Sequence, residues 1–219
     1  MLAPSLNVIP ASLGQHLAAY VQGGGHLVLG PRSGMKDEFN RLDTRRQPGP
    51  LVKPLGGRVE QYYALDEKLT VTGEIGSGTA SLWGEDLSAS SPHTSIILRY
   101  AANETWLSGK PAALRANYGK GTLTYLGTVL DPAALGTFIK QALDAAHVAP
   151  WFGPLPPEVE VARRTAAGHA VFILINHGKS PCTFDLPRAL HDVLASDRAV
   201  GSVTLAAQGV AVLEDSYAR

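Results

Sequence analysis

The segment from Gly23 to Asn40 constrains the fold more than any other part of this 219-residue chain. Before it, Ala11 to Gln22 carries apolar residues at helical spacing, with Pro10 at the expected first turn and three glycines just past the end. A short apolar run follows and opens into a charged loop. The pattern predicts a helix over 11–22, a buried strand at His26 to Leu29, and a polar loop where that strand ends.

Pro150 to Pro157 predicts a boundary between two domains, because it holds four prolines and one glycine in eight residues. Upstream, helix and strand patterns alternate, which predicts a sheet with flanking helices. Downstream, short strands at a spacing of about ten residues predict a small antiparallel β-sandwich. The expected strands are 159–164, 170–175, 182–186, 202–205 and 210–214. The predicted organisation is an α/β domain over 1–149, a linker over 150–157 and a β domain over 158–219.

Local patterns add more elements to the first domain. A strand is expected at Leu123 to Leu126, and a helix at Asp131 to Ala146 with Asp131 as its cap. The inward side chains of this helix are expected to be Leu135, Phe138, Ile139 and Leu143. Gly119 to Gly121 is interpreted as a hairpin turn with Lys120 at its tip, and 73–91 as a mobile loop or subunit arm. Trp151 and Phe152 are expected to pack where the domains join.

The composition excludes several classes of partner. Hydrophobic residues make up 45% of the chain, charged residues 17%, and the formal net charge is zero. Nucleic-acid binding usually demands a basic excess, which is lacking here. No apolar run approaches the roughly 20 residues that span a bilayer, and the first residues do not resemble a signal peptide. Cys182, the single cysteine, allows no internal disulfide and favours a cytoplasmic location.

Five segments, taken in order, resemble the trimerisation domain of the β-galactosidases of glycoside hydrolase family 42. The first is the loop after the predicted strand, with Arg32, Ser33, Gly34, Lys36, Asp37, Glu38 and Asn40. The likeness continues through residues 109–112, 119–127, 159–163 and 172–177. It implies a partial flavodoxin-like, or amidotransferase-like, α/β sheet with flanking helices, followed by the β domain. In the family further strand and helix units precede Ala3 to Ser5, so an exposed sheet edge that favours self-association is expected.

The resemblance also implies what the chain does. The family carries its two catalytic glutamates on a (β/α)8 barrel, which needs roughly 250 residues and does not fit beside the matched domains. We therefore expect a non-catalytic assembly region that associates with itself, a trimer being favoured, or with a separate catalytic barrel. Arg32, Ser33, Lys36, Asp37, Glu38 and Asn40 are the candidate binding or interface residues. The alternatives are part of an active β-galactosidase hydrolysing terminal β-D-galactosides, with its barrel elsewhere, or a carbohydrate-binding module.

Other chemistry has weaker support. Ser33 and Lys36 have the Ser-x-x-Lys spacing of penicillin-binding enzymes, but the companion motifs are lacking. Class I glutamine amidotransferases resemble this turn, yet Arg32 and Ser33 stand where they carry a nucleophilic cysteine. Cys182 falls in the β domain and cannot take that role. A small-molecule site at the end of the strand stays open as a minor possibility.

No cofactor or metal is expected. The seven histidines show no metal-binding spacing, and the glycine runs do not open a helix after a strand as a phosphate loop does. Sugar stacking would have to use scattered aromatic residues, which form no evident ladder and are better explained by packing. The candidates for such stacking are Tyr62, Tyr63, Trp83, Trp106, Tyr118 and Trp151.

Overall fold

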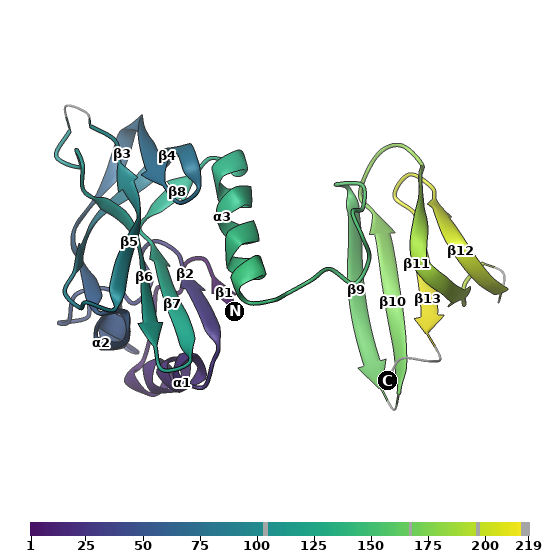
Figure 1. The fold of residues 1–219 in the computed structure, drawn as a ribbon, viewed down its shortest axis with the longest axis horizontal. Helices are drawn as coiled ribbons and strands as arrows, with labels where there is room; N and C mark the ends of the chain where they lie inside the picture. Colours follow the sequence, from purple (N-terminus) through teal and green to yellow (C-terminus); the bar gives the residue numbers. More distant parts are fainter. Residues whose placement is uncertain (103–104, 167, 196–197, 216–219) are drawn as a thin grey trace. The chain divides into compact units, whose positions relative to one another are not determined.

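The computed structural model describes residues 1–102, 105–166, 168–195 and 198–215. The chain divides into two compact units, Met1–Val148 and Ala149–Arg219. Its described residues are mostly β structure, with thirteen strands and three α-helices (Figure 1). None of these helices is long and apolar enough to cross a membrane.

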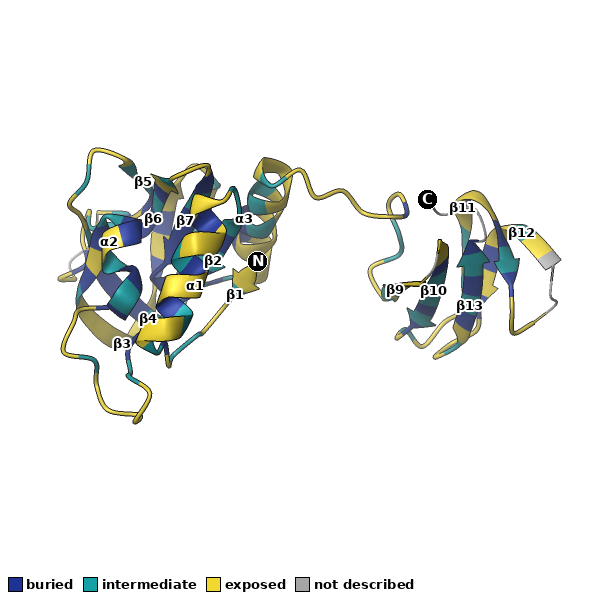
Figure 2. Ribbon diagram, turned by 90° about the horizontal axis from the view of Figure 1, so that it is seen from below, coloured by how far each residue is buried: buried dark blue, intermediate teal, exposed yellow. Residues whose placement is uncertain are grey.

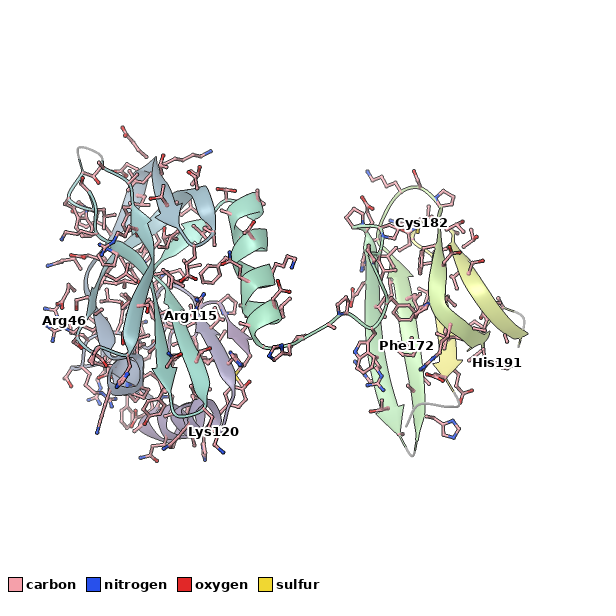
Figure 3. All side chains as sticks on the ribbon, in the orientation of Figure 1. Arg46, Arg115, Lys120, Phe172, Cys182 and His191 are labelled. Atoms are coloured by element: carbon pink, nitrogen blue, oxygen red, sulfur yellow. The ribbon has the colours of Figure 1, made fainter. Side chains whose placement is uncertain are left out.

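Unit 1 contains the helix over 11–22 and the strand at His26–Leu29 that the sequence predicts, and both predictions are confirmed at the residue level. Its helices are α1 (Ala11–Gln22), the 3-10 turn η1 (Gly49–Leu51), α2 (Val52–Leu55) and α3 (Pro132–Ala145). Its strands are β1 (Leu2–Ala3), β2 (His26–Leu29), β3 (Gly57–Gly73), β4 (Gly76–Ala89), β5 (Thr94–Tyr100), β6 (Pro111–Tyr118), β7 (Gly121–Leu126) and β8 (Thr128–Leu130). The predicted turn at Lys120 is confirmed as the tip of the β6–β7 hairpin (Figure 3).

The strands of unit 1 form one mixed sheet in the order β1-β2-β7-β6-β5-β3-β4-β8. Among the strand pairs of this sheet that the structure describes, β1–β2 and β2–β7 are parallel and the others are antiparallel. Gly127 joins β7 to β8: its N–H donates to the Ala112 carbonyl on β6 at 2.8 Å, and its carbonyl accepts from the Glu85 N–H on β4 at 2.9 Å. The sheet therefore curls, so that β4 is hydrogen-bonded to the residue that joins β7 to β8. Because antiparallel pairs dominate, the flavodoxin-like expectation is not confirmed.

The long β3–β4 hairpin corrects one prediction. Residues 73–91 do not form a mobile loop, because β4 pairs with β3 from Gly76 opposite Gly73 to Ala89 opposite Gly57. The sequence interpretation rested on the many small residues of β4. These residues are interspersed with Ala80 and Leu87, which the fold buries almost completely. A strand rich in Gly, Ser and Thr is stable here because both of its neighbours in the sheet, β3 and β8, are present.

In α1 and α3, the burial and the capping that the sequence predicts can be compared with the structure. Figure 2 shows both buried and exposed residues along α1, and the buried residues include Leu17 and Val21. In α3 the predicted cap is confirmed, since Asp131 Oδ1 accepts from the N–H groups of Ala133 and Ala134, both at 3.0 Å. Phe138 and Ala134 are buried in α3. The predicted burial of Leu135 and Leu143 is wrong: they are 39% and 37% exposed, because only the side of α3 that carries Ala134, Phe138 and Ile139 packs into the core.

Unit 2 consists of one five-stranded antiparallel sheet with the order β12-β11-β13-β10-β9. The strands are β9 (Val159–Ala166), β10 (His169–Asn176), β11 (Cys182–Asp192), β12 (Arg198–Leu205) and β13 (Val210–Asp215), which confirms all five predicted strands. It is not the sandwich of two sheets that we expected. The physical reason is β11, which is long enough to pair with β12 along two stretches and with β13 through His191 and Asp192.

A hydrophobic cluster of its own holds unit 2 together. Phe152 is 3% exposed, and its ring meets that of Phe172 edge-on at 5.0 Å (Figure 3). Trp151 remains 61% exposed, with the guanidinium of Arg163 over its ring at 3.7 Å. Buried Asn176 fixes the nearby turns, because its Nδ2 donates to the carbonyls of Ser180 and Ala206, both at 2.9 Å.

Candidate functional site

The turn after β2 fixes the loop that carries the predicted contact residues. A Cβ on Gly30 would lie 1.8 Å from the carbonyl oxygen of Pro4, so only glycine lets the chain pass this close to the end of β1. Arg32 follows with φ of 65°, a left-handed conformation that side chains other than glycine seldom adopt. The guanidinium carbon of Arg32 lies 5.1 Å from the ring centre of Trp83 on β4.

Ser33 and Lys36 do not form a catalytic pair. Ser33 is fully buried, and its Oγ donates to the Gly30 carbonyl at 2.7 Å and accepts from the Leu6 N–H at 3.2 Å. Lys36 instead donates from Nζ to Asn40 Oδ1 at 2.8 Å. Ser33 therefore connects the loop to the segment after β1 by hydrogen bonds, and its hydroxyl is not exposed to solvent.

The remaining polar residues of the loop satisfy one another locally. Asp37 Oδ1 accepts from the N–H groups of Phe39 and Arg41 at 2.9 and 3.0 Å, and Oδ2 accepts from Arg41 Nε at 3.0 Å. Glu38 is exposed. The loop also presents Phe39 and Leu42 to solvent, with 69% and 63% of their surface exposed. The six predicted site residues thus share one loop, but they do not converge on a single point.

A buried carboxylate that sequence reasoning missed anchors this loop. Glu85 on β4 is fully buried. Its Oε1 accepts from the Arg32 N–H at 2.9 Å and from Trp83 Nε1 at 2.8 Å, and its Oε2 accepts from the Tyr125 hydroxyl at 2.8 Å. The carboxylate therefore ties the turn after β2 to strands β4 and β7.

Burial raises the pKa of Glu85 to about 7, although the hydrogen bonds from Trp83, Arg32 and Tyr125 favour its ionised form. A sequence signal for this position does exist. In Trp83-x-Glu85-x-Leu87 the three named residues alternate as residues of one strand face do, and Leu87 is buried. The signal was lost because the segment was interpreted as a loop.

Most candidate sugar-stacking residues are already engaged within the chain. The Tyr62 ring stacks on that of Trp83 with centres 5.4 Å apart and planes 19° from parallel. Tyr63 meets Trp106 edge-on at 6.0 Å. The guanidinium of Arg32 also lies over the ring of Trp83, so Tyr62, Trp83 and Arg32 form one group of stacked side chains.

An apolar pocket of about 620 Å³ lies at the carboxyl ends of β1 and β2. Ala3, Leu29, Trp83, Val129 and Phe138 contribute to its walls, so it extends from the sheet edge to α3. Its lining is almost wholly apolar. Among the residues that the structure describes, no three His, Cys, Asp or Glu side chains gather as a metal site requires.

The described residues thus form a curled mixed sheet that carries a polar loop, followed by a small antiparallel β domain. The family profile of the β-galactosidase trimerisation domain matches residues 1–149, and that of the β-galactosidase C-terminal domain matches residues 158–215. The chain belongs to the β-galactosidases of glycoside hydrolase family 42 and comprises these two domains.

Individual relatives agree with the profiles. The β-galactosidase Bga of Halorubrum lacusprofundi is 30% identical over 163 residues, covering 68% of this chain and 23% of that protein. BgaH of Haloferax lucentense is 28% identical over 219 residues, covering 99% of this chain and 31% of its own length. The chain therefore spans less than a third of these relatives.

Solved structures share the fold. The β-galactosidase of Bacillus circulans sp. alkalophilus superposes with a TM-score of 0.87 at 24% identity, covering 97% of this chain and 32% of that one. The β-galactosidase of Rahnella sp. R3 gives a TM-score of 0.83 at 25% identity, covering 98% of this chain and 32% of that one. In both cases the likeness includes both units of this chain.

Proposed function

We propose that this chain is a non-catalytic assembly region that joins copies of itself into a homo-oligomer, with a trimer as the favoured state. The observation that carries the proposal is the match of residues 1–149 to the trimerisation domain. We assign 1–149 to the assembling domain, 150–157 to a linker and 158–219 to the C-terminal domain. Within the first domain, we propose that β1, β2, β7 and α1 correspond to part of a flavodoxin-like sheet.

The physical support comes from the loop after β2. Asp37 is paired with Arg41, and Lys36 donates to the neutral side chain of Asn40, so two of the loop's charged groups already have partners within the chain when a second copy approaches. Exposed Phe39 and Leu42 supply apolar area, which is the usual driving force of association. Arg32, Lys36, Asp37, Glu38 and Asn40 are the proposed contact residues, while Ser33 supports the loop from inside.

Catalytic activity would have to come from outside these residues. A retaining glycosidase holds two carboxyl groups about 5 Å apart beside the sugar. Glu85 does not fit that role, because three donors enclose its carboxylate. The alternative function is therefore part of an active β-galactosidase, acting on terminal β-D-galactosides through a separate barrel partner. A carbohydrate-binding role is less favoured because the stacked aromatic residues already contact one another. A cytoplasmic location stays a prediction.

Light scattering on a sizing column, across a range of protein concentrations, tests the proposal. We expect a mass of three chains of 23.1 kDa each. A monomer at every concentration would contradict the assembly function. A chromogenic β-galactoside assay on the same fractions should show no hydrolysis, and turnover that co-elutes with the chain would contradict the non-catalytic assignment.

A further inference from the structure

The start of the loop after β2 is anchored on both sides of a two-residue turn. Before the turn, the Gly30 N–H donates to a carbonyl of β1 at 3.1 Å. After it, the buried Gly34 donates its N–H to the carbonyl of Leu6 at 2.8 Å. Between these anchors lie half-buried Pro31 and exposed Arg32, here called the Pro31–Arg32 turn. This turn can move while the rest of the loop stays in place.

The buried carboxylate of Glu85 holds the Pro31–Arg32 turn in its closed form. The bond from the Arg32 N–H to Glu85 Oε1, at 2.9 Å, is the shortest hydrogen bond that the structure describes for these two residues. Their carbonyls accept longer bonds from the side chains of Ser5 and Asn7, at 3.4 and 3.3 Å. Arg32 also has a left-handed φ of 65°, which a residue other than glycine keeps only when its surroundings hold it there. Without Glu85 the closed turn would lose its main support.

The apolar pocket at the carboxyl ends of β1 and β2 gives the turn room to move. Pro31 and Arg32 both line this cavity of about 620 Å³, together with Trp83, over whose ring the Arg32 guanidinium lies. The turn therefore borders open space, into which it can shift without displacing packed side chains. Such a shift would separate Arg32 from Glu85 and admit water to a carboxylate that the closed form excludes from solvent completely.

Among the groups that face this carboxylate, Glu85 itself is the one that changes charge near neutral pH, since burial raises its pKa to about 7. The Tyr100 hydroxyl on β5 accepts from the Glu85 N–H at 3.1 Å, and the Tyr125 hydroxyl on β7 donates to Oε2. Burial raises the pKa of both phenols above 10, so they stay protonated at neutral pH. The other charged groups nearby are the Arg32 guanidinium and the ion pair of Asp86 with Lys110.

We propose that the Pro31–Arg32 turn is a proton-controlled latch: a proton on Glu85 keeps the turn closed, and loss of that proton to solvent favours an open form in which water reaches the carboxylate. In the closed, neutral form Oε2 can donate to the Tyr125 hydroxyl while Oε1 still accepts from the Arg32 N–H, so the turn stays bonded. The latch concerns how one chain holds its own loop and does not rest on the proposed assembly function.

Proton binding and opening of the turn are thermodynamically linked. The Arg32 N–H binds the ionised carboxylate more strongly than the neutral one, but exclusion of water costs the charge more. In the open form water solvates the charge, and the pKa of Glu85 returns toward its ordinary value of 4.5. The closed form therefore binds the proton more tightly, so opening becomes easier as the pH rises from 4.5 through about 7. Between pH 6 and 8 the equilibrium constant for opening should increase about tenfold.

Hydrogen exchange of the Arg32 backbone amide, resolved by NMR, measures how often the turn opens. Dividing by the exchange rate of an unstructured peptide at each pH removes the ordinary rise of exchange with pH. We expect the protection of the Arg32 N–H to fall about tenfold between pH 6 and 8. In Glu85→Gln, which makes equivalent hydrogen bonds without a titrating proton, the protection should stay constant. Glu38→Gln, at an exposed position of the same loop, is the matched control and should keep the wild-type fall.

The amide of Gly34 separates opening of the turn from unfolding of the whole unit. Its N–H should stay more strongly protected than that of Arg32 at every pH, because its bond to Leu6 lies beyond the turn. The inference is overturned by equal protection of the two amides, by constant protection of Arg32 in wild type, or by a fall that persists in Glu85→Gln. The wild-type series needs no variant, so it decides even if Glu85→Gln does not fold. A chain that is monomeric by light scattering would contradict the assembly function and leave the latch standing.

Discussion

At the residue scale, Glu85 decides how the loop after β2 is held. The fold places its carboxylate in a fully buried position and surrounds it with donors from Arg32, Trp83 and Tyr125. Each donor stabilises the ionised form, but burial has the larger effect and raises the pKa to about 7. The anchor of the loop is therefore a group whose charge changes close to neutral pH.

The raised pKa of Glu85 makes the free energy of unfolding depend on pH. The folded chain binds the Glu85 proton more tightly than the unfolded chain, whose pKa is near 4.5. The contribution of Glu85 to the free energy of unfolding therefore falls as the pH rises from about 4.5 through about 7, by roughly 3 kcal/mol at most.

Glu85→Gln should remove most of this dependence. A glutamine can accept from Arg32 and Trp83 through its oxygen and donate to the Tyr125 hydroxyl through its nitrogen, without a buried charge. Urea unfolding of both proteins between pH 4.5 and 8 should show the variant gaining stability over wild type as the pH rises. Glu38→Gln, at an exposed position on the loop, is the control and should keep the wild-type slope. Parallel curves for wild type and Glu85→Gln would contradict the account.

At the element scale, two helix glycines have opposite surroundings. Gly14 in α1 is buried, and an added Cβ would lie 2.5 Å from both Cβ and Cγ of Pro50 in the 3-10 turn η1. Gly136 in α3 has nothing within 4 Å of the same position. The first glycine lets α1 pack closely against η1, whereas the second costs helix stability and brings no contact in return.

Replacing these two glycines by alanine should therefore have opposite effects on the free energy of unfolding. Gly136→Ala gains helix propensity, and we expect it to raise the free energy of unfolding by up to about 1 kcal/mol. Gly14→Ala gains the same propensity but forces α1 away from Pro50, and overpacking of this kind costs about 1–3 kcal/mol. Thermal melts of both variants beside wild type provide the measurement. A stabilised Gly14→Ala would mean that α1 can shift without loss of packing.

At the scale of the whole molecule, the two units have separate hydrophobic cores. The two clusters of unit 1 include Leu27, Leu123, Tyr100 and Phe138, while the cluster of unit 2 gathers around Phe172. The proposed contact loop lies in unit 1. Assembly should therefore not depend on the second unit.

A chain ending at Val148 should consequently form the same oligomer as the full chain. Light scattering of the two proteins at matched concentrations measures this directly, with circular dichroism to check that the shortened chain is folded. If the full chain is a trimer and a folded shortened chain stays monomeric, contacts in unit 2 drive assembly, and the loop after β2 is not sufficient.

Local signals predicted much of this fold. The helix α1 and strand β2 follow from apolar spacing and glycine punctuation, and the cap at Asp131 follows from a short-range contact with the first turn of α3. The errors arose where distant segments decide. Leu135 carries the pattern of an inward residue, yet the sheet leaves it at the edge of the packed face. The segment 73–91 has loop composition, yet β3 and β8 pair with it.

The sequence by itself determined the family, the order of the main elements and the loop that carries the candidate contact residues, because these depend on residues close together along the chain. Only the tertiary structure decided that Ser33 is internal and bound to the segment after β1, and that Glu85 anchors the loop from β4. Each of these depends on groups dozens of residues apart or on how completely the fold excludes water. Hydrogen bonding and burial at that range are properties of packing, which no local pattern encodes.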